Sequence, residues 1–145
     1  MLRKTGADYV LLKEQGTDLP KQHTRSFRHH QHRREARKPM SKHAIVAGVG
    51  MIPFVKPGTN APYPTMGSTA AQLALQDAGI EYTSIQLAYV GYIYGDSTCG
   101  QAALYQIGCT GIPIINVNNN CSSGSTALYL ARQAVEAGIA ECVLA

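Results

Sequence analysis

Residues 111–138, GIPIINVNNNCSSGSTALYLARQAVEAG, hold the pattern that decides the fold. The first seven are short, rich in β-branched residues and bounded by turn formers, which predicts a buried strand. After a polar neck, apolar residues recur at helical spacing as far as Gly138, so we expect a helix over residues 122–137, with Asn120 and Ser122 as candidate caps. Cys121 lies between the two elements. At a helix N-terminus, unpaired N–H groups and the macrodipole favour a thiolate.

The residues alone leave two interpretations of Cys121 open. A thiolate attacks thioesters and other carbonyls, so Cys121 is a candidate nucleophile. Most lone cysteines are instead small buried hydrophobes. The three asparagines at residues 118–120 are also ordinary turn formers, which leaves the choice undecided.

The rest of the globular part alternates strands with helices. We expect strands at 43–50, 88–94 and 141–145, a helix at 65–78 ended by Gly79, and a short helix at 101–107. This order predicts an α/β sheet with right-handed crossovers, whose reactive groups gather at the carboxyl ends of the strands. The Gly48-Val49-Gly50 triplet does not open a dinucleotide site, because Pro53 stands where a third glycine is needed and no helix pattern follows.

The charge of the chain divides at about residue 42. Residues 1–42 hold eleven of the thirteen Lys and Arg and four of the nine acids, a net charge of +7. Residues 43–145 have a net charge of −3, so the two parts together give the whole chain a net charge of +4. We therefore predict a basic, His/Arg-rich, disordered leader over 1–42 and a domain over 43–145.

A basic run such as residues 25–34 can bind the phosphates of nucleic acid or of an acidic membrane surface. A solvated tail without a specific nucleic-acid partner is the interpretation we favour, because no folded recognition module accompanies the run. Four of the five histidines lie between residues 23 and 32, where a tail does not provide the geometry of a metal site. A mitochondrial presequence fits poorly with the four acids, and Met40 is a candidate internal start.

The cysteines exclude several classes of protein. Cys99, Cys109, Cys121 and Cys142 form no Cys-x-x-Cys pair and have no histidine among them, which argues against a zinc ribbon or a thioredoxin-like motif. The spacing is not that of a small disulfide-bonded scaffold, so we expect reduced thiols. No apolar run reaches the roughly 18 residues that a membrane span needs.

Two blocks, GYIYGDSTCGQ at 91–101 and GIPIINVNNNC at 111–121, resemble the thiolase domains of the sterol carrier protein X type. The resemblance begins near His43 and continues through GSTAL at 124–128 and AECVLA at 140–145. It implies a peroxisomal 3-oxoacyl-CoA thiolase, whose two similar βαβαβαββ halves pack into a five-layered body. The chain would then hold the first part of the first half: a βαβαβ core in an incomplete layered sheet.

The resemblance also implies a chemistry. Cys121 corresponds to the nucleophile that takes the acyl group from a 3-oxoacyl-CoA, with CoA as co-substrate and no tightly bound cofactor or metal. In the family a histidine and a second cysteine of the C-terminal half transfer the protons. His43, Cys99 and Cys142 do not match them, so we expect this chain to be inactive by itself.

The family further implies peroxisomal β-oxidation of fatty acids and sterol side chains by a homodimer of the full-length enzyme. The chain carries no peroxisomal targeting signal that we recognise. The alternative is a non-catalytic short isoform that acts as an interaction or lipid-transport-associated protein.

Overall fold

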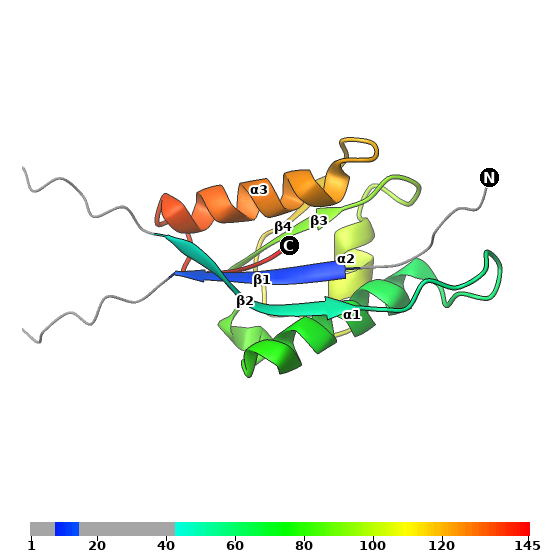
Figure 1. The fold of residues 1–145 in the computed structure, drawn as a ribbon, viewed down its shortest axis with the longest axis horizontal. Coiled ribbons are helices and arrows are strands. Elements are labelled where there is room, and N and C mark those ends of the chain that lie inside the picture. Colours follow the sequence, from blue (N-terminus) through cyan, green and yellow to red (C-terminus); the bar gives the residue numbers. More distant parts are fainter. Residues whose placement is uncertain (1–7, 15–42) are drawn as a thin grey trace, which may run out of the picture.

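The computed structural model describes residues 8–14 and 43–145. Its elements in chain order are β1 (Asp8–Glu14), β2 (Ala44–Met51), α1 (Tyr63–Ala78), the 3-10 turn η1 (Tyr82–Ser84), β3 (Leu87–Gly91), α2 (Cys99–Leu104), β4 (Ile114–Val117), α3 (Ser123–Glu136) and β5 (Cys142–Leu144) (Figure 1). The strands alternate with helices after β2, which confirms the predicted α/β class.

The strands form one sheet in the order β2-β1-β5-β3-β4. β3 pairs in parallel with both β4 and β5, whereas β1 pairs antiparallel with both β2 and β5. It follows that β2 runs in the same direction as β3, β4 and β5. Among the described strands, β1 alone runs the other way.

The position of β1 corrects the prediction for the leader. We expected residues 1–42 to be disordered, and this is wrong for Asp8–Glu14, which forms β1 inside the sheet. The segment reads DYVLLKE. The net charge of residues 1–42 does not reveal this strand, because it averages the short apolar run with the many basic residues around it. The basic run at 25–34, the histidines between 23 and 32 and Met40 lie outside the described residues, so the remaining expectations for them stay predictions.

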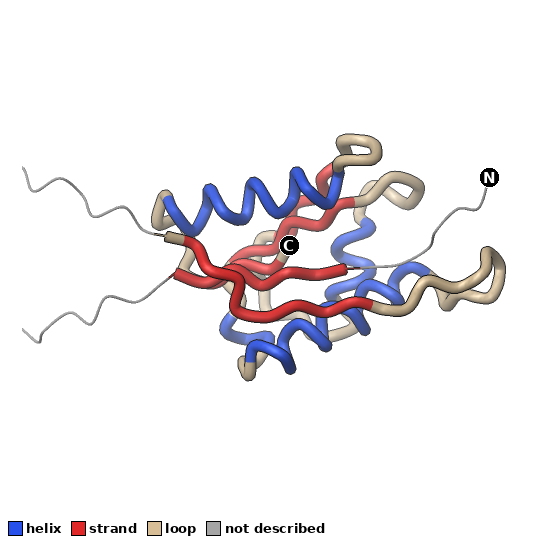
Figure 2. The backbone as a smooth tube through the Cα atoms, viewed as in Figure 1, coloured by secondary structure: helices blue, strands red, loops and turns tan. Residues whose placement is uncertain are grey.

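Helices cover both faces of the sheet, as Figure 2 shows. On one face α1 packs with α2, and their apolar side chains meet Ala88, Val90 and Leu144 in one core cluster. On the other face α3 buries Ala131, Ala134 and Val135 against a second cluster that includes Leu87 and Val143. Alternate residues of β3 and β5 thus point to opposite faces, and full burial of each Leu or Val contributes about 1.5–3 kcal/mol.

Two glycines let α1 lie directly on β2. A Cβ added at Gly48 would overlap the backbone of Ala74, and one added at Gly50 would overlap the backbone of Ala70. The Gly48-Val49-Gly50 triplet therefore serves helix packing. The predicted end of α1 is confirmed, because Gly79 takes the left-handed conformation with φ +66°.

Candidate functional site

Cys121 lies on a short turn that leads from β4 into α3. β4 ends at Val117 and α3 begins at Ser123, so the turn has room for only five residues. Among the described residues other than glycine, Asn120 alone has a positive φ, 49°, and asparagine tolerates this left-handed conformation better than most residues. The side chain of Cys121 is exposed.

The hydroxyl of Ser123 holds this turn in place. The Asn119 N–H donates to Ser123 Oγ at 2.8 Å. The same Oγ lies 2.9 Å from the carbonyl oxygen of Asn120 and 3.1 Å from that of Tyr92, and its single proton serves these two acceptors. Ser123 is only 4% exposed, so it fastens the turn from inside the protein to the residue that follows β3.

Further side chains close the outside of the turn. Asn119 Nδ2 donates to Thr126 Oγ1 at 3.0 Å, and Thr126 Oγ1 donates to the Ser122 carbonyl oxygen at 2.9 Å. Ser122 is the N-cap residue, but its hydroxyl donates to the Asn119 carbonyl oxygen at 2.8 Å and caps no helix N–H. The prediction that Asn120 or Ser122 caps the helix through its side chain is therefore wrong.

The start of α3 also lies close against the end of β3. A Cβ added at Gly91 would come within 2.8 Å of the Ser123 carbonyl carbon and 2.9 Å of the Gly124 nitrogen. Only a glycine allows this approach. Together with the bond from Ser123 to Tyr92, it places Cys121 at the carboxyl ends of two neighbouring parallel strands, as predicted.

The neighbouring loop, residues 95–100, is fixed in turn by Asn116 of β4. Asn116 Oδ1 accepts the N–H of Gly100 at 2.7 Å, and its Nδ2 donates to Gln101 Oε1 at 2.7 Å. Gln101 Nε2 donates to the Ile114 carbonyl oxygen at 3.2 Å. Asn116 thus binds the first turn of α2 across the sheet, which explains why α2 begins at Cys99 and not at the predicted residue 101.

Cys99 is the first residue of α2 and is a poor nucleophile. It is buried, and its thiol donates to the Asp96 carbonyl oxygen at 2.6 Å. Burial raises the pKa of the Cys99 thiol, which favours the unreactive protonated form. Tyr63 donates its hydroxyl to Asp96 Oδ2 at 2.9 Å, and this bond to a carboxylate raises the pKa of Tyr63 to about 12.

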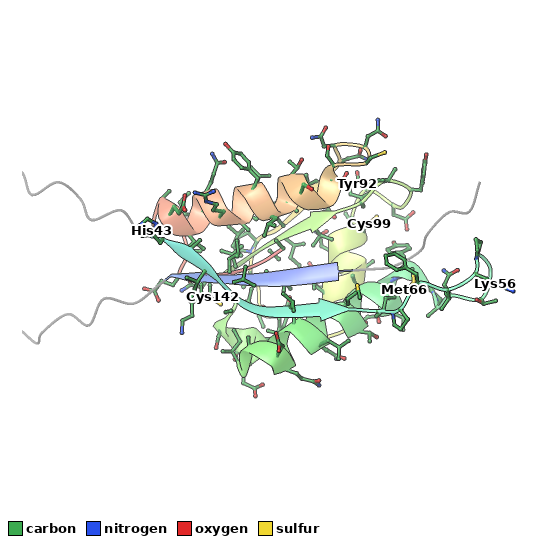
Figure 3. All side chains as sticks on the ribbon, viewed as in Figure 1. His43, Lys56, Met66, Tyr92, Cys99 and Cys142 are labelled. Carbon is green, nitrogen blue, oxygen red and sulfur yellow. The ribbon has the colours of Figure 1, made fainter. Side chains whose placement is uncertain are left out.

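The other candidate residues are placed away from the turn. Cys142 is buried in β5, as expected of a strand-core residue, and burial raises the pKa of its thiol. His43 precedes β2, at the amino ends of the parallel strands (Figure 3). Because α3 has fourteen residues, the two ends of the sheet are separated by about 21 Å, at about 1.5 Å per residue. His43 is thus not a partner of Cys121.

Among residues 8–14 and 43–145, no group of three or more His, Cys, Asp or Glu side chains is arranged to hold a metal ion. In the same residues, no helix is both long and apolar enough to cross a membrane.

The fold agrees with a comparison against protein families. The family described as "Thiolase, N-terminal domain" matches residues 44–145, which include every element except β1. The chain belongs to this family. The predicted resemblance to thiolases is therefore confirmed, and Cys121 lies inside the matched residues.

Individual relatives support the same relation. Sterol carrier protein 2 of Oryctolagus cuniculus is 61% identical over 104 residues, which cover 70% of this chain and 19% of the relative. Sterol carrier protein 2 of Gallus gallus is 58% identical over 108 residues, or 73% of this chain and 20% of the relative. A benzoylsuccinyl-CoA thiolase subunit of Thauera aromatica is 34% identical over 107 residues, which cover 72% of this chain and 27% of the relative. The chain spans about a fifth of the length of the sterol carrier proteins that it matches.

A solved structure supports the fold alone. The 3-oxoacyl-[acyl-carrier-protein] synthase III of Aquifex aeolicus superposes with a TM-score of 0.51 at 17% identity. The superposition covers 60% of this chain and 29% of the synthase.

Sequence reasoning missed Ser123 and Asn116. A signal for Ser123 was available, because Ser123, Ala127 and Ala131 recur at every fourth residue and all are buried on the inner face of α3. A polar residue at a core position of a helix indicates a buried hydrogen bond. No comparable pattern pointed to Asn116, whose partners come from another element.

Proposed function

We propose that Cys121 is the acyl-accepting nucleophile of a thiolase-type acyltransferase. One observation carries the proposal: an exposed sulfur on a turn that buried Ser123 holds at the carboxyl ends of parallel strands, directly before a helix. A sulfur in this position is accessible to a substrate carbonyl, which a cysteine nucleophile attacks. Of the four cysteines, Cys121 alone combines exposure with this position.

The reaction is the cleavage of a 3-oxoacyl-CoA by CoA. The Cys121 thiolate attacks the 3-oxo carbon, and a backbone N–H donor such as that of Cys121 stabilises the resulting oxyanion. The C2–C3 bond then breaks, and the departing carbon takes a proton to give acetyl-CoA or propanoyl-CoA. The acyl group remains on the sulfur as a thioester. The thiol of a second CoA takes the acyl group and leaves its proton for the cysteine.

This sequence of steps needs acid/base groups that the described residues do not provide near Cys121. His43, the one histidine among residues 8–14 and 43–145, lies at the other end of the sheet. We therefore propose that the 145-residue chain accepts an acyl group slowly and does not turn over. The relatives are about five times as long as the matched part, and in this proposal segments outside the match supply these groups.

The proposed substrates are CoA thioesters, either straight or 2-methyl-branched, in peroxisomal β-oxidation. The resemblance described above supports this class of substrate, as does the name of the benzoylsuccinyl-CoA thiolase subunit. Imaging of the tagged chain beside a peroxisomal marker tests the location, and a diffuse cytosolic signal would contradict it.

Mass spectrometry tests the nucleophile directly. The purified chain is incubated with acetoacetyl-CoA and digested, and the acylated peptides are identified. Cys109 provides a matched control, because it is also an exposed cysteine but lies far from any helix start in the sequence. We expect acylation of Cys121 in the wild type and in Cys109→Ser, and none in Cys121→Ser. Equal acylation of Cys109 and Cys121 would show that exposure alone governs the reaction.

A second function, as an interaction protein, is favoured by a different observation. The edge strand β2 exposes Val46, Val49 and Met51 by 58%, 55% and 58%, which is unusual for large apolar side chains on a sheet edge. Analytical ultracentrifugation of the wild type and of Val49→Lys tests it. Self-association that the lysine abolishes supports this function, and a monomer at all concentrations contradicts it.

A further inference from the structure

β1 occupies a position that is closed on four sides. β2 and β5 flank it, with Val10 opposite Val49 on one edge and Leu12 opposite Val143 on the other. α1 and α3 contact it from the two faces of the sheet (Figure 1). This space fits an extended segment and no wider element.

One side chain of β1 reaches deep into the protein. Leu12 is 4% exposed and belongs to the core cluster beneath α3, which contains Leu87, Ala131, Ala134, Val135, Ala140 and Val143. The adjacent Lys13 is exposed, so the two positions show the alternation of a strand with one buried face. A strand in this position therefore needs an apolar residue in the place of Leu12 and can carry a charged residue in the place of Lys13.

β2 joins the sheet through β1 alone. Neighbouring strands lie about 4.8 Å apart, which puts the backbones of β2 and β5 about 9.6 Å apart, too far to pair with each other. If the position were empty, the backbone groups that face it from both strands would lose their partners between two packed helices. Such a loss is costly, so the position must be filled.

The segment that fills the position lies outside the family match. The matched residues start at 44, so β2 and β5 belong to them and β1 does not. The two strands that flank the position thus lie within the family match, whereas the strand that fills it here lies outside the match.

The link between β1 and β2 is long for paired antiparallel neighbours. Glu14 lies opposite Ala44, yet 29 residues, 15–43, separate them along the chain. Two to five residues normally join such strands. The pairing of β1 with β2 is therefore not that of a tight hairpin.

We propose that the space between β2 and β5 is a strand-binding slot, which Asp8–Glu14 occupies in cis and which accepts the same segment in trans when the cis strand is impaired. The partner that it fits is an extended segment, antiparallel to both neighbours, with an apolar residue in the place of Leu12. This inference does not depend on the role of Cys121.

A disulfide trap tests the cis occupancy in the full chain. Lys13 lies opposite Cys142, and the Cβ atoms of opposing residues are about 4.5–5.5 Å apart, close to what a disulfide requires. Lys13→Cys is therefore expected to form a disulfide with Cys142 under mild oxidation. Glu14→Cys is the control, because residue 14 lies opposite Ala44 of β2 and not opposite a cysteine. Disulfide-linked peptides are mapped by mass spectrometry.

We expect a dominant link between residues 13 and 142 in the first variant and no dominant link to residue 142 in the second. The same mixture of links to the exposed Cys109 and Cys121 in both variants would overturn the proposal, because it would show a segment with no fixed register. The disulfide test leaves the core residue Leu12 unchanged, so it can be read even if a variant with a substitution at residue 12 does not fold.

Peptide addition tests the slot in trans. Leu12→Asp places a charge in the core cluster and is expected to weaken β1 in the full chain. A synthetic peptide of residues 6–16 should then raise the melting temperature of this variant in a saturable way, and a scrambled peptide should not. The wild type, whose slot is filled, should not respond. Failure of the peptide to stabilise Leu12→Asp at millimolar concentration would overturn exchange in trans.

Discussion

Ser123 Oγ lies 3.1 Å from the carbonyl oxygen of Tyr92, and this contact joins the first residue of α3 to the residue after β3. The two residues are 31 positions apart in the chain. Because the Asn119 N–H donates to the same Oγ, one buried hydroxyl positions both sides of the turn that carries Cys121. The place of the candidate nucleophile therefore depends on a side chain that need not touch a substrate.

Ser123→Ala should destabilise the protein. The part-buried bonds of Ser123 Oγ to the Asn119 N–H and to the carbonyl oxygens are lost, and a group left unsatisfied in this way costs up to about 1–3 kcal/mol. Ser125→Ala is the control, because Ser125 is an exposed serine of the same helix, and its change should stay within about 0.5 kcal/mol. Urea unfolding measures both values. Equal stabilities of the two variants would show that the buried hydroxyl is dispensable.

Gly50→Ala should be strongly unfavourable, because the added Cβ overlaps the backbone of α1. Overpacking of this kind costs about 1–3 kcal/mol. Gly124→Ala makes the same chemical change at a helical position with nothing within 4 Å of the added carbon, so it should be neutral or stabilise by up to about 1 kcal/mol. Thermal unfolding of both variants checks the difference, and a stable Gly50→Ala protein would mean that α1 does not lie on β2 as described.

The four cysteines should react with iodoacetamide in two groups. Cys109 and Cys121 are exposed and should be alkylated first. Cys99 and Cys142 are buried, and burial raises the pKa of both thiols, so they should react slowly in the native state. Mass spectrometry of timed samples gives the order. In urea all four should react alike, and fast native alkylation of Cys142 would contradict the packing of β5.

Stability should fall at alkaline pH in part because of Cys142. Burial raises the pKa of this thiol in the folded state above the ordinary value of 9.0, so the folded protein holds the proton more tightly than the unfolded chain. The resulting stabilisation is complete below pH 9 and is lost as the pH rises through the folded pKa. Cys142→Ala should make the alkaline decline of the free energy of unfolding less steep. Cys109→Ala, a change at an exposed position, is the control. A slope that is unchanged by Cys142→Ala would contradict the assignment.

Local patterns were sufficient for most of the elements. β4 confirms the prediction of a strand before the asparagines, but the expectation that this strand is buried is wrong, because β4 lies at the edge of the sheet and Val117 alone of its residues is buried. The helical spacing after Cys121 is confirmed by α3. Gly79 ends α1 as expected. Each of these features depends on residues a few positions apart, so a periodicity and a stop signal were enough to find them.

Interactions across the sheet were not predicted. Asn116 moves the start of α2 to Cys99, because its amide binds Gly100 and Gln101 from another strand. Ser122 donates its hydroxyl proton to the Asn119 carbonyl oxygen within the turn, and its oxygen accepts no helix N–H. Both outcomes depend on which groups the fold brings together, and chain order does not reveal this.

The amino-acid sequence by itself determined the α/β class, the thiolase family and the position of Cys121 between a strand and a helix, because these follow from short-range periodicity and from motifs. Tertiary structure decided that Asp8–Glu14 is a strand of the sheet, that Ser123 holds the turn of Cys121, and that His43 lies at the opposite end. The physical reason is pairing. A strand and a buried hydroxyl are stable only where other segments supply their hydrogen-bond partners, and those partners are chosen by the packed fold.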